Sequence, residues 1–250
     1  MSDLTHDKFL GGRVRAWQPA RGYRAGVDPV LLAAAVQARP GETALELGCG
    51  VGVASLCLAA RVPGVQVTGV ELQPAYAALA RRNAEAVAGF SVVEADLRRL
   101  PPELKQRRFH HVFMNPPYFD REAGTASDDG GRDIAFGGAT ALADWIDAGA
   151  RRVGPQGYLT LIQRIERLPE VLAALTGRLG SVVVRPIAGR AGRAPERFLL
   201  RARQEGRAPF HLAAPLVLHE GPAHDGDRES YTEEIKGILR EGAALFLTGR

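Results

Sequence analysis

Short apolar runs alternate with amphipathic stretches along most of this 250-residue chain. The apolar runs are rich in β-forming residues, as is typical of buried strands, while the stretches between them carry apolar residues at helical spacing. We expect strands at 43–47, 65–70, 90–94, 112–114 and 158–162, and helices at 29–36, 53–60, 74–88, 140–153 and 168–178. Strands that alternate with helices of this length predict an α/β fold with a doubly wound, mostly parallel sheet.

Two further strands are expected at 181–187 and 196–203, separated only by a Gly- and Arg-rich loop. A connection this short suits an antiparallel hairpin, which we place at the edge of the same sheet. The sheet is therefore predicted to be seven-stranded, with an apolar run at 216–220 and a last helix at 232–246 completing the chain. Because the pattern contains no repeat and no second core, residues 27–250 are predicted to form one domain.

The segment before this domain has a different character. Residues 1–26 mix basic and aromatic side chains, and we interpret them as an irregular arm or a lid over a site. Asp28 is then expected to cap the first helix, with Pro29 at the first helical position. A second unusual segment is the Gly- and Asp-rich connection 120–138, because loops of that length in compact domains are usually functional or disordered.

Composition narrows the class of protein. The chain is 46% hydrophobic and 24% charged, like ordinary soluble globular proteins. It contains no run near the roughly 20 apolar residues that span a bilayer, and its N-terminus is polar, so we expect a cytoplasmic protein without membrane contact. Cys49 and Cys57 fit neither a disulfide framework nor a metal-ligand motif, and His110 and His111 are expected to be structural, so no metal site is predicted.

Positive charge is concentrated in the second half of the chain. The net charge is +4, but residues 151–207 contain twelve arginines against four glutamates. Such a basic region permits an anionic polymer as substrate. A genome with biased codon usage could produce the same arginine content without any function.

A glycine-rich turn joins the strand 43–47 to the helix that follows it. Its residues are Glu46, Gly48, Gly50 and Gly52, each separated by one residue. Glycines at such a turn adopt positive φ and let the backbone approach a ligand closely. The spacing differs from the Gly-x-Gly-x-x-Gly pattern of dinucleotide-binding folds, in which the helix N-terminus binds a pyrophosphate.

Acidic residues mark the ends of the next two strands. Glu71 follows the strand 65–70 and could hold ribose hydroxyls, while Asp96 follows the strand 90–94 and could accept a hydrogen bond from the exocyclic amine of a purine. Either residue alone could equally be a helix cap. Their shared position at successive strand ends favours a common ligand.

The fourth strand ends in Asn115, Pro116, Pro117 and Tyr118. Proline has no backbone donor and pushes the preceding residue out of the α region, so the strand stops in a rigid, extended turn. In open α/β sheets ligands bind at this end of the strands. An asparagine side-chain oxygen and an unpaired carbonyl can accept hydrogen bonds from an amino group, and an aromatic ring can stack on a base.

Together these motifs resemble the class I S-adenosylmethionine-dependent methyltransferases, which have a Rossmann-like sheet, over roughly residues 18–165. The resemblance implies that the glycine turn passes under the cofactor, that Glu71 binds its ribose and that Asp96 reads its adenine. Asn-Pro-Pro-Tyr implies the branch that methylates planar amino nitrogens. The cofactor site implied in this way comprises Tyr23, Glu46, Gly48, Gly50, Gly52, Glu71, Leu72, Asp96, Leu97 and Asn115.

The resemblance also implies a reaction. The Asn115 side chain and the Pro116 carbonyl would accept the two N–H bonds of the amine, and Tyr118 would stack on the base. No metal and no covalent step is required, because the sulfonium is already a positive leaving group and positioning suffices. The substrate is expected to contact Arg24, Pro117, Tyr118, Arg190 and Arg193.

Two outer patterns point to one branch. Gln18-Pro19-x-x-Gly22-Tyr23-Arg24-x-Gly26-Val27-Asp28, and His219-Glu220-Gly221 followed by Tyr231-Thr232-Glu233-Glu234, resemble the bacterial tRNA(Val) adenine N6-methyltransferases. This resemblance implies a structured RNA, in particular a tRNA, as substrate. The alternatives are a glutamine methyltransferase acting on release factors, disfavoured because only about 40 residues precede the first strand, and a non-catalytic cofactor- or nucleic-acid-binding relative, disfavoured by the intact motifs.

Overall fold

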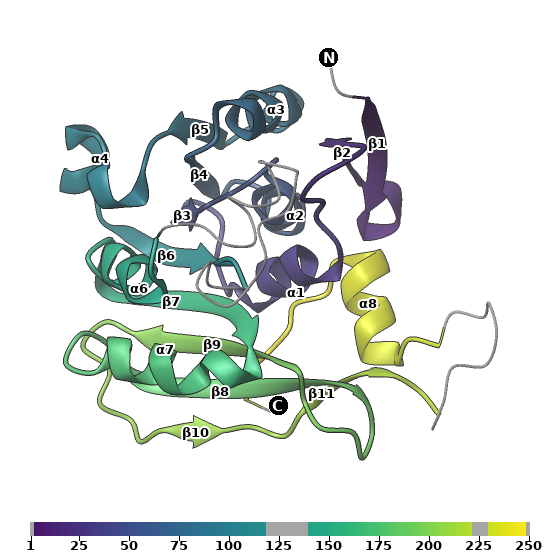
Figure 1. The fold of residues 1–250 in the computed structure, drawn as a ribbon, viewed down its shortest axis with the longest axis vertical. Coiled ribbons are helices and arrows are strands. Elements are labelled where there is room, and N and C mark those ends of the chain that lie inside the picture. The colour runs from purple at the N-terminus through teal and green to yellow at the C-terminus, as the bar shows by residue number, and fades with distance from the viewer. Residues whose placement is uncertain (1–2, 119–139, 222–229, 249–250) are drawn as a thin grey trace.

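The fold is built on one large, twisted sheet with helices on both faces (Figure 1). The structure is a computed structural model that describes residues 3–118, 140–221 and 230–248; the predicted long connection 120–138 lies outside these residues. The strands are β1 Leu4–Phe9, β2 Val14–Pro19, β3 Thr43–Leu47, β4 Gln66–Glu71, β5 Phe90–Glu94, β6 Phe109–Met114, β7 Val153–Arg164, β8 Gly180–Arg190, β9 Arg197–Arg203, β10 His211–Leu212 and β11 Leu216–His219. The helices are α1 Val27–Ala35, α2 Val53–Arg61, α3 Pro74–Ala84, α4 Pro102–Gln106, α6 Leu142–Ala150, α7 Leu168–Leu175 and α8 Glu233–Glu241.

The order of the strands confirms the doubly wound sheet. The main sheet runs β10-β8-β9-β7-β6-β3-β4-β5, and β11 also pairs with β8. Strands β5, β4, β3, β6 and β7 are parallel neighbours, whereas β9 is antiparallel to both β7 and β8. The predicted hairpin is therefore present. It is not the outermost part of the sheet, because β10 and β11 pair in parallel with the outer side of β8. The sheet therefore has nine strands in the described residues rather than the predicted seven.

Burial on both faces explains why the central strands are continuous apolar runs. In β6, Phe113 packs into the core on one face, while Val112 and Met114 pack into the core on the other. Helices α1, α2, α3 and α8 contribute to the first core, and α4, α6 and α7 to the second. Parallel strands covered in this way need no polar alternation, which is why the sequence pattern predicted them well.

The N-terminal segment is more ordered than predicted. Instead of an irregular arm, β1 and β2 form an antiparallel hairpin that pairs from Leu4–Pro19 to Phe9–Val14. The hairpin is fixed to α3, because Asn83 accepts a hydrogen bond from Trp17 N at 2.8 Å and donates one to Trp17 O at 3.0 Å. The expectation of an irregular segment was wrong, because a six-residue strand with mixed polarity resembles a coil when its partner is unknown. The role of this segment as a lid stays a prediction.

Several predicted boundaries also need correction. Helix α1 begins at Val27 after Gly26, so Asp28 lies in the first turn and is not its cap. The helices predicted at 74–88, 140–153, 168–178 and 232–246 are each shorter, and the short α4 was not predicted. Within the described ranges no helix is long and apolar enough to cross a membrane.

Candidate active site

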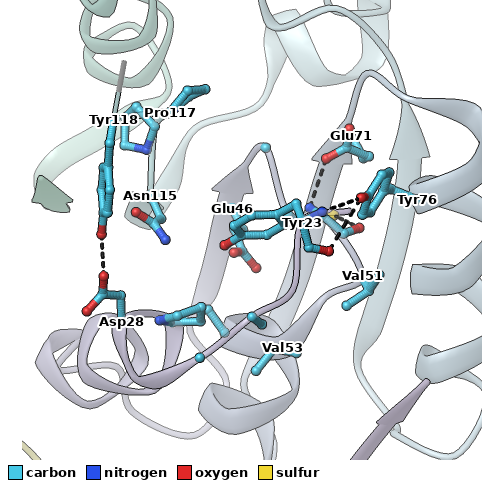
Figure 2. A pocket seen from close by; sticks show the side chains of 18 of the residues that line it. Tyr23, Asp28, Glu46, Val51, Val53, Glu71, Tyr76, Asn115, Pro117 and Tyr118 are labelled. Carbon is cyan, nitrogen blue, oxygen red and sulfur yellow. Dashed lines mark hydrogen bonds between the residues drawn. The ribbon is translucent and has the colours of Figure 1, made fainter. Parts of the chain in front are cut away.

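A cavity of about 660 Å³ opens at the carboxyl ends of the parallel strands. Residues from the N-terminal segment, the glycine turn, the ends of β4 and β6, and the C-terminal part of the chain line it (Figure 2). This edge is where an open α/β sheet binds ligands. The predicted strand-end residues therefore meet in one place.

The glycine turn after β3 has the backbone that only glycine adopts easily. Gly48, Gly50 and Gly52 all have positive φ. A Cβ on Gly48 would lie 2.3 Å from the Trp145 ring, and a Cβ on Gly52 would lie 2.8 Å from the Phe90 ring. The turn is therefore packed tightly from both sides, and its position against the cavity is fixed.

Glu71 shapes this turn as well as facing the cavity. It accepts a hydrogen bond from Gly50 N at 2.8 Å and another from Gln73 N at 2.8 Å (Figure 2). Its side chain is buried, and burial raises the pKa of Glu71 above its usual value although these backbone donors oppose the shift. The carboxylate is therefore preorganised at the end of β4 as a hydrogen-bond acceptor.

Glu46 lies beneath the turn and is the most deeply buried acid of the site. Its Oε2 accepts hydrogen bonds from Ser55 N at 3.1 Å and from Ser55 Oγ at 2.5 Å. Burial raises the pKa of Glu46 to about 8, in spite of these hydrogen bonds. A positive charge placed beside Glu46 would favour its ionised form.

Asp96 occupies the next strand end but is more exposed. It accepts hydrogen bonds from Arg98 N and from Arg98 Nη2, both at 2.8 Å, and these bonds lower the pKa of Asp96. The carboxylate therefore stays ionised and lines the cavity together with Leu97. Leu72, which follows Glu71, also lines the cavity and is half exposed.

Tyr23 contributes to the wall of the cavity next to the glycine turn. Its backbone N donates a hydrogen bond to the Tyr76 hydroxyl at 3.1 Å, and its ring lies over the glycine turn near Glu46 (Figure 2). A Cβ on Gly50 would lie 3.7 Å from the Tyr23 ring, so the turn and the ring leave a narrow space between them. The N-terminal segment therefore contributes directly to the cavity.

Asn115 presents an unsatisfied acceptor. Its side-chain Oδ1 is buried and has no hydrogen-bond partner among the described residues. Buried polar atoms are nearly always paired, so an exception at a strand end that lines a cavity indicates a ligand donor. The Asn115 backbone cannot relax easily, because the following Pro116 restricts it.

Gln163 at the end of β7 holds the loop that carries Asn115. It is fully buried, and its Nε2 donates hydrogen bonds to the carbonyls of Pro116 and Pro117, each at 3.3 Å. One lone pair of the Pro116 carbonyl is therefore used inside the protein, and a second remains for a ligand. Sequence analysis missed Gln163, although its place at a strand end was a usable signal.

Tyr118 is anchored by a residue from the first helix. Its hydroxyl donates a hydrogen bond to Asp28, and Arg197 at the start of β9 forms an ion pair with the same carboxylate (Figure 2). Burial, with the charge of Asp28, raises the pKa of Tyr118, so the phenol stays neutral. The ring orientation therefore depends on residues far apart in sequence, which no local motif could have identified.

Most of the predicted site residues line the cavity. These are Tyr23, Arg24, Glu46, Gly48, Gly50, Glu71, Leu72, Asp96, Leu97, Asn115, Pro116, Pro117 and Tyr118. Gly52, Arg190 and Arg193 lie outside the lining described, and Arg190 donates hydrogen bonds to the carbonyls of Glu220 and Gly221. Residues that sequence analysis did not assign to the site also line it, namely Asp28, Trp145, Arg197, Leu218, His219 and Tyr231.

The chemistry of the lining suits S-adenosylmethionine. Carboxylates of Glu71 and Asp96 supply acceptors for hydroxyl and amino groups, and the glycine turn leaves space where side chains would intrude. Trp145 Nε1 is a buried donor without a partner among the described residues. The part of the chain that the structure describes holds no cluster of three or more metal-ligating residues.

Comparison with known proteins agrees with this assignment. Residues 44–126 match a family model described as a methyltransferase domain. A predicted O-methyltransferase from Agrobacterium tumefaciens superimposes with a TM-score of 0.71 at 28% identity, covering 88% of this chain and 98% of that one. A T. thermophilus 16S rRNA N2 G1207 methyltransferase, solved with AdoMet and guanosine, shares the fold with a TM-score of 0.56 at 21% identity, over 81% of this chain and 50% of that one.

The fold and the site define an S-adenosylmethionine-dependent methyltransferase. Two sequence relatives are more specific. A tRNA1(Val) (adenine(37)-N6)-methyltransferase from Porphyromonas gingivalis is 30% identical over 231 residues, covering 85% of this chain and 88% of the relative. An enzyme of the same name from Yersinia pseudotuberculosis is 31% identical over 199 residues, covering 76% of this chain and 77% of the relative. The chain belongs to the family of tRNA1(Val) (adenine(37)-N6)-methyltransferases.

Proposed function

We propose that this enzyme methylates the exocyclic N6 amine of an adenine in a structured RNA, in particular a tRNA. The observation that carries the proposal is the buried, unpartnered Oδ1 of Asn115, which lies where the fourth parallel strand ends. The family relatives, which are named for the same reaction on tRNA1(Val), support the choice of substrate.

The reaction needs the amine to be held rather than deprotonated. The lone pair of an aromatic amine is drawn into the ring, so acceptors that bind both N–H bonds favour the geometry in which the lone pair faces the methyl donor. Asn115 Oδ1 and the free lone pair of the Pro116 carbonyl are the two acceptors, and Gln163 keeps the loop in place. The cofactor supplies a methyl group on a positively charged sulfur.

The base is oriented by Tyr118. Its ring stands beside Asn115 on the loop, with the hydroxyl tied to Asp28, so the ring plane is set before the base arrives (Figure 2). A flipped or loop-exposed adenine stacks on this face while its amine meets Asn115. Because Asp28 also pairs with Arg197, the charge of the carboxylate is balanced inside the site.

The residues that would hold the cofactor follow β3, β4 and β5. Glu71 would accept hydrogen bonds from ribose hydroxyls, Asp96 would accept one from an adenine amine, and the glycine turn would leave space for the bound group. The raised pKa of Glu46 keeps this group mostly neutral in the free enzyme, and a ligand that carries positive charge would favour its ionised form. Tyr23 and Arg24, at the end of the N-terminal segment, line the same cavity, and we propose that Arg24 contacts the substrate there.

The deciding experiment compares two acceptors with one labelled cofactor. Bulk tRNA that lacks the modification should become labelled, and mass spectrometry of its nucleosides should show N6-methyladenosine. A release-factor protein should remain unlabelled. Labelling of the protein and not the RNA would replace the proposal with a glutamine methyltransferase, and labelling of neither would contradict both.

A further inference from the structure

A pair of stacked aromatic rings lies at the end of the cavity that the reaction described above does not use. The rings of His219 and Tyr231 stand 4.7 Å apart and are inclined by 20°. Both residues line the same cavity as the glycine turn and Asn115. Both residues open sequence motifs near the C-terminus, His219-Glu220-Gly221 and Tyr231-Thr232-Glu233-Glu234, that take no part in the proposed reaction.

The order of the strands shows how the cavity is divided. The residues that suit the cofactor follow β3, β4 and β5, and Asn115 follows β6. Arg197 and His219 come from β9 and β11, on the far side of β6, because Arg197 pairs with Arg164 at the end of β7 and His219 pairs with Arg190 at the end of β8. The cavity thus continues past the target amine in the direction away from the cofactor.

The stacked rings are not needed to hold the backbone there. Glu220 N donates to Ser230 O at 2.7 Å, Thr232 N donates to Leu218 O at 3.0 Å, and the Thr232 hydroxyl donates to Val217 O at 3.0 Å. These three hydrogen bonds already fasten the segment at 230–232 to β11. Both rings line the cavity beside this fastened segment.

Two arginines lie near this surface, although Asp28 balances the charge of Arg197. Arg197 lines the cavity, and Arg190 Nη2 donates to Ser230 Oγ at 3.4 Å, which in turn lies 3.1 Å from His219 Nδ1. An aromatic platform next to arginines suits a nucleotide, since every base has a face for stacking and every phosphate is an anion.

We propose that the His219–Tyr231 platform binds the nucleotide adjacent to the target adenine in the RNA, with its base stacked on the rings. The proposal rests on the proposed function and adds a second base-binding position to it. Stacking of one base on an aromatic side chain is generally worth about tenfold or more in affinity. The platform therefore helps to select where along the RNA the adenine is presented.

The test is a cycle between the protein and the RNA. The full-length enzyme methylates a tRNA stem-loop that contains the target adenine, either intact or with the base of one neighbouring nucleotide removed. Removal of the correct neighbour should lower kcat/KM of the wild type about tenfold, mainly through KM. His219→Ala should show the same loss on the intact RNA and no additional loss on the RNA without that base, because both changes remove one interaction.

A matched control exists on the N-terminal hairpin. His6 and Trp17 form a similar stacked pair, with ring centroids 4.3 Å apart, but neither residue is among those that line the cavity. His6→Ala should leave kcat/KM on both RNAs unchanged. Tyr231→Phe, which keeps the ring, should behave like the wild type, and calorimetry should show equal cofactor affinity for all variants.

A measurement without any substitution guards against misfolded variants. RNA with 5-iodouridine beside the target adenine should photo-crosslink to His219 or Tyr231 of the wild type. The platform would be overturned if the losses in kcat/KM from the two changes multiply, or if His219→Ala has the kcat/KM of the wild type. Crosslinks found only at other residues would also overturn it. If the wild type methylates no RNA at all, the proposed function itself fails, which is a different and earlier result.

Discussion

The two halves of the cavity are built in different ways. On the side of β3 to β5, the acids are held by neighbours close in sequence, as Glu46 is by Ser55 and Asp96 by Arg98. On the other side, Tyr118 depends on Asp28, and Asp28 on Arg197, across 90 and 169 positions of the chain. We name the first side the proposed cofactor half and the other the proposed substrate half. Glu46 and Asp96 in the first are held by local contacts, whereas Tyr118 in the second is held by a residue far away in the sequence.

The halves also differ in how complete they are. Glu71 already accepts two backbone hydrogen bonds, so the cofactor half is preorganised and largely satisfied. Asn115 in the substrate half keeps a buried oxygen without a partner in the described ranges, a state that costs free energy. The hydrogen bonds of the first half are thus largely in place before a ligand binds, whereas the second half keeps an acceptor among the described residues that a ligand can satisfy. Substitutions should separate the two accordingly.

The largest effect is expected for Asn115→Ala. Loss of the acceptor that orients the amine should lower the single-turnover rate by roughly 10²- to 10³-fold, by analogy with the loss of one preorganised hydrogen-bonding group in other active sites. Cofactor affinity measured by calorimetry should stay the same. Asn115→Asp, which keeps an oxygen in place, should retain more of the rate than Ala, and an active Ala variant would refute the division of the cavity.

A smaller effect, on cofactor affinity rather than on the rate of methyl transfer, is expected for Glu71→Ala. Hydrogen bonds to a charged acceptor contribute about 1.5–3 kcal/mol, so cofactor affinity should fall roughly tenfold to a hundredfold. Methyl transfer at saturating cofactor should change much less. Glu94→Ala removes a carboxylate from the end of β5 whose partner Arg81 lies on the exposed surface, and affinity in this control should not change. Equal losses in both variants would contradict a specific role for Glu71.

Asp28→Asn should lower kcat about tenfold, because the charged acceptor that aligns Tyr118 and pairs with Arg197 is weakened. The loss should appear in kcat on RNA, while cofactor affinity is unchanged. Glu170→Gln, which breaks the ion pair with Arg167 away from the cavity lining, serves as the control for loss of an ion pair. A drop in cofactor affinity instead would show that the halves are coupled.

The smallest effect concerns pH. The pKa of Glu46 is raised to about 8, so at neutral pH this buried group is mostly protonated in the free enzyme. A positively charged ligand favours the ionised form; cofactor binding should therefore release protons and become roughly fivefold tighter from pH 6.5 to 8.5. Calorimetry in buffers of different ionisation enthalpy measures the release. In Glu46→Gln, the proton release should fall to the amount that the ligand itself contributes.

The same shift predicts a stability change in the free enzyme. A carboxyl whose folded pKa lies above its unfolded value stabilises the fold below the unfolded pKa and loses that contribution as pH rises toward about 8. The Tm of the free wild type should therefore fall more between pH 5 and pH 8.5 than the Tm of Glu46→Gln. Identical slopes would show that Glu46 is ionised in the free enzyme.

Local signals in the sequence were sufficient for the framework and the cofactor half. Buried parallel strands are apolar on both faces, and strand ends such as Glu71 and Asn115 are marked by abrupt changes in composition. The glycine turn was equally readable, because positive φ at Gly48 and Gly52 leaves few other residues possible. Each of these properties depends on a few consecutive residues, so one sequence contains the necessary information.

Tertiary structure alone decided the rest. The sequence could not show that 4–19 form a hairpin against α3, that Asp28 faces Tyr118 rather than capping α1, or that Gln163 holds the proline carbonyls. These contacts join residues that lie far apart along the chain. Nothing in the sequence around either residue indicates its partner until the fold brings the two together. Strand order determines which segments meet: β9 and β11 lie beyond β6, and so His219 and Tyr231 enter the cavity.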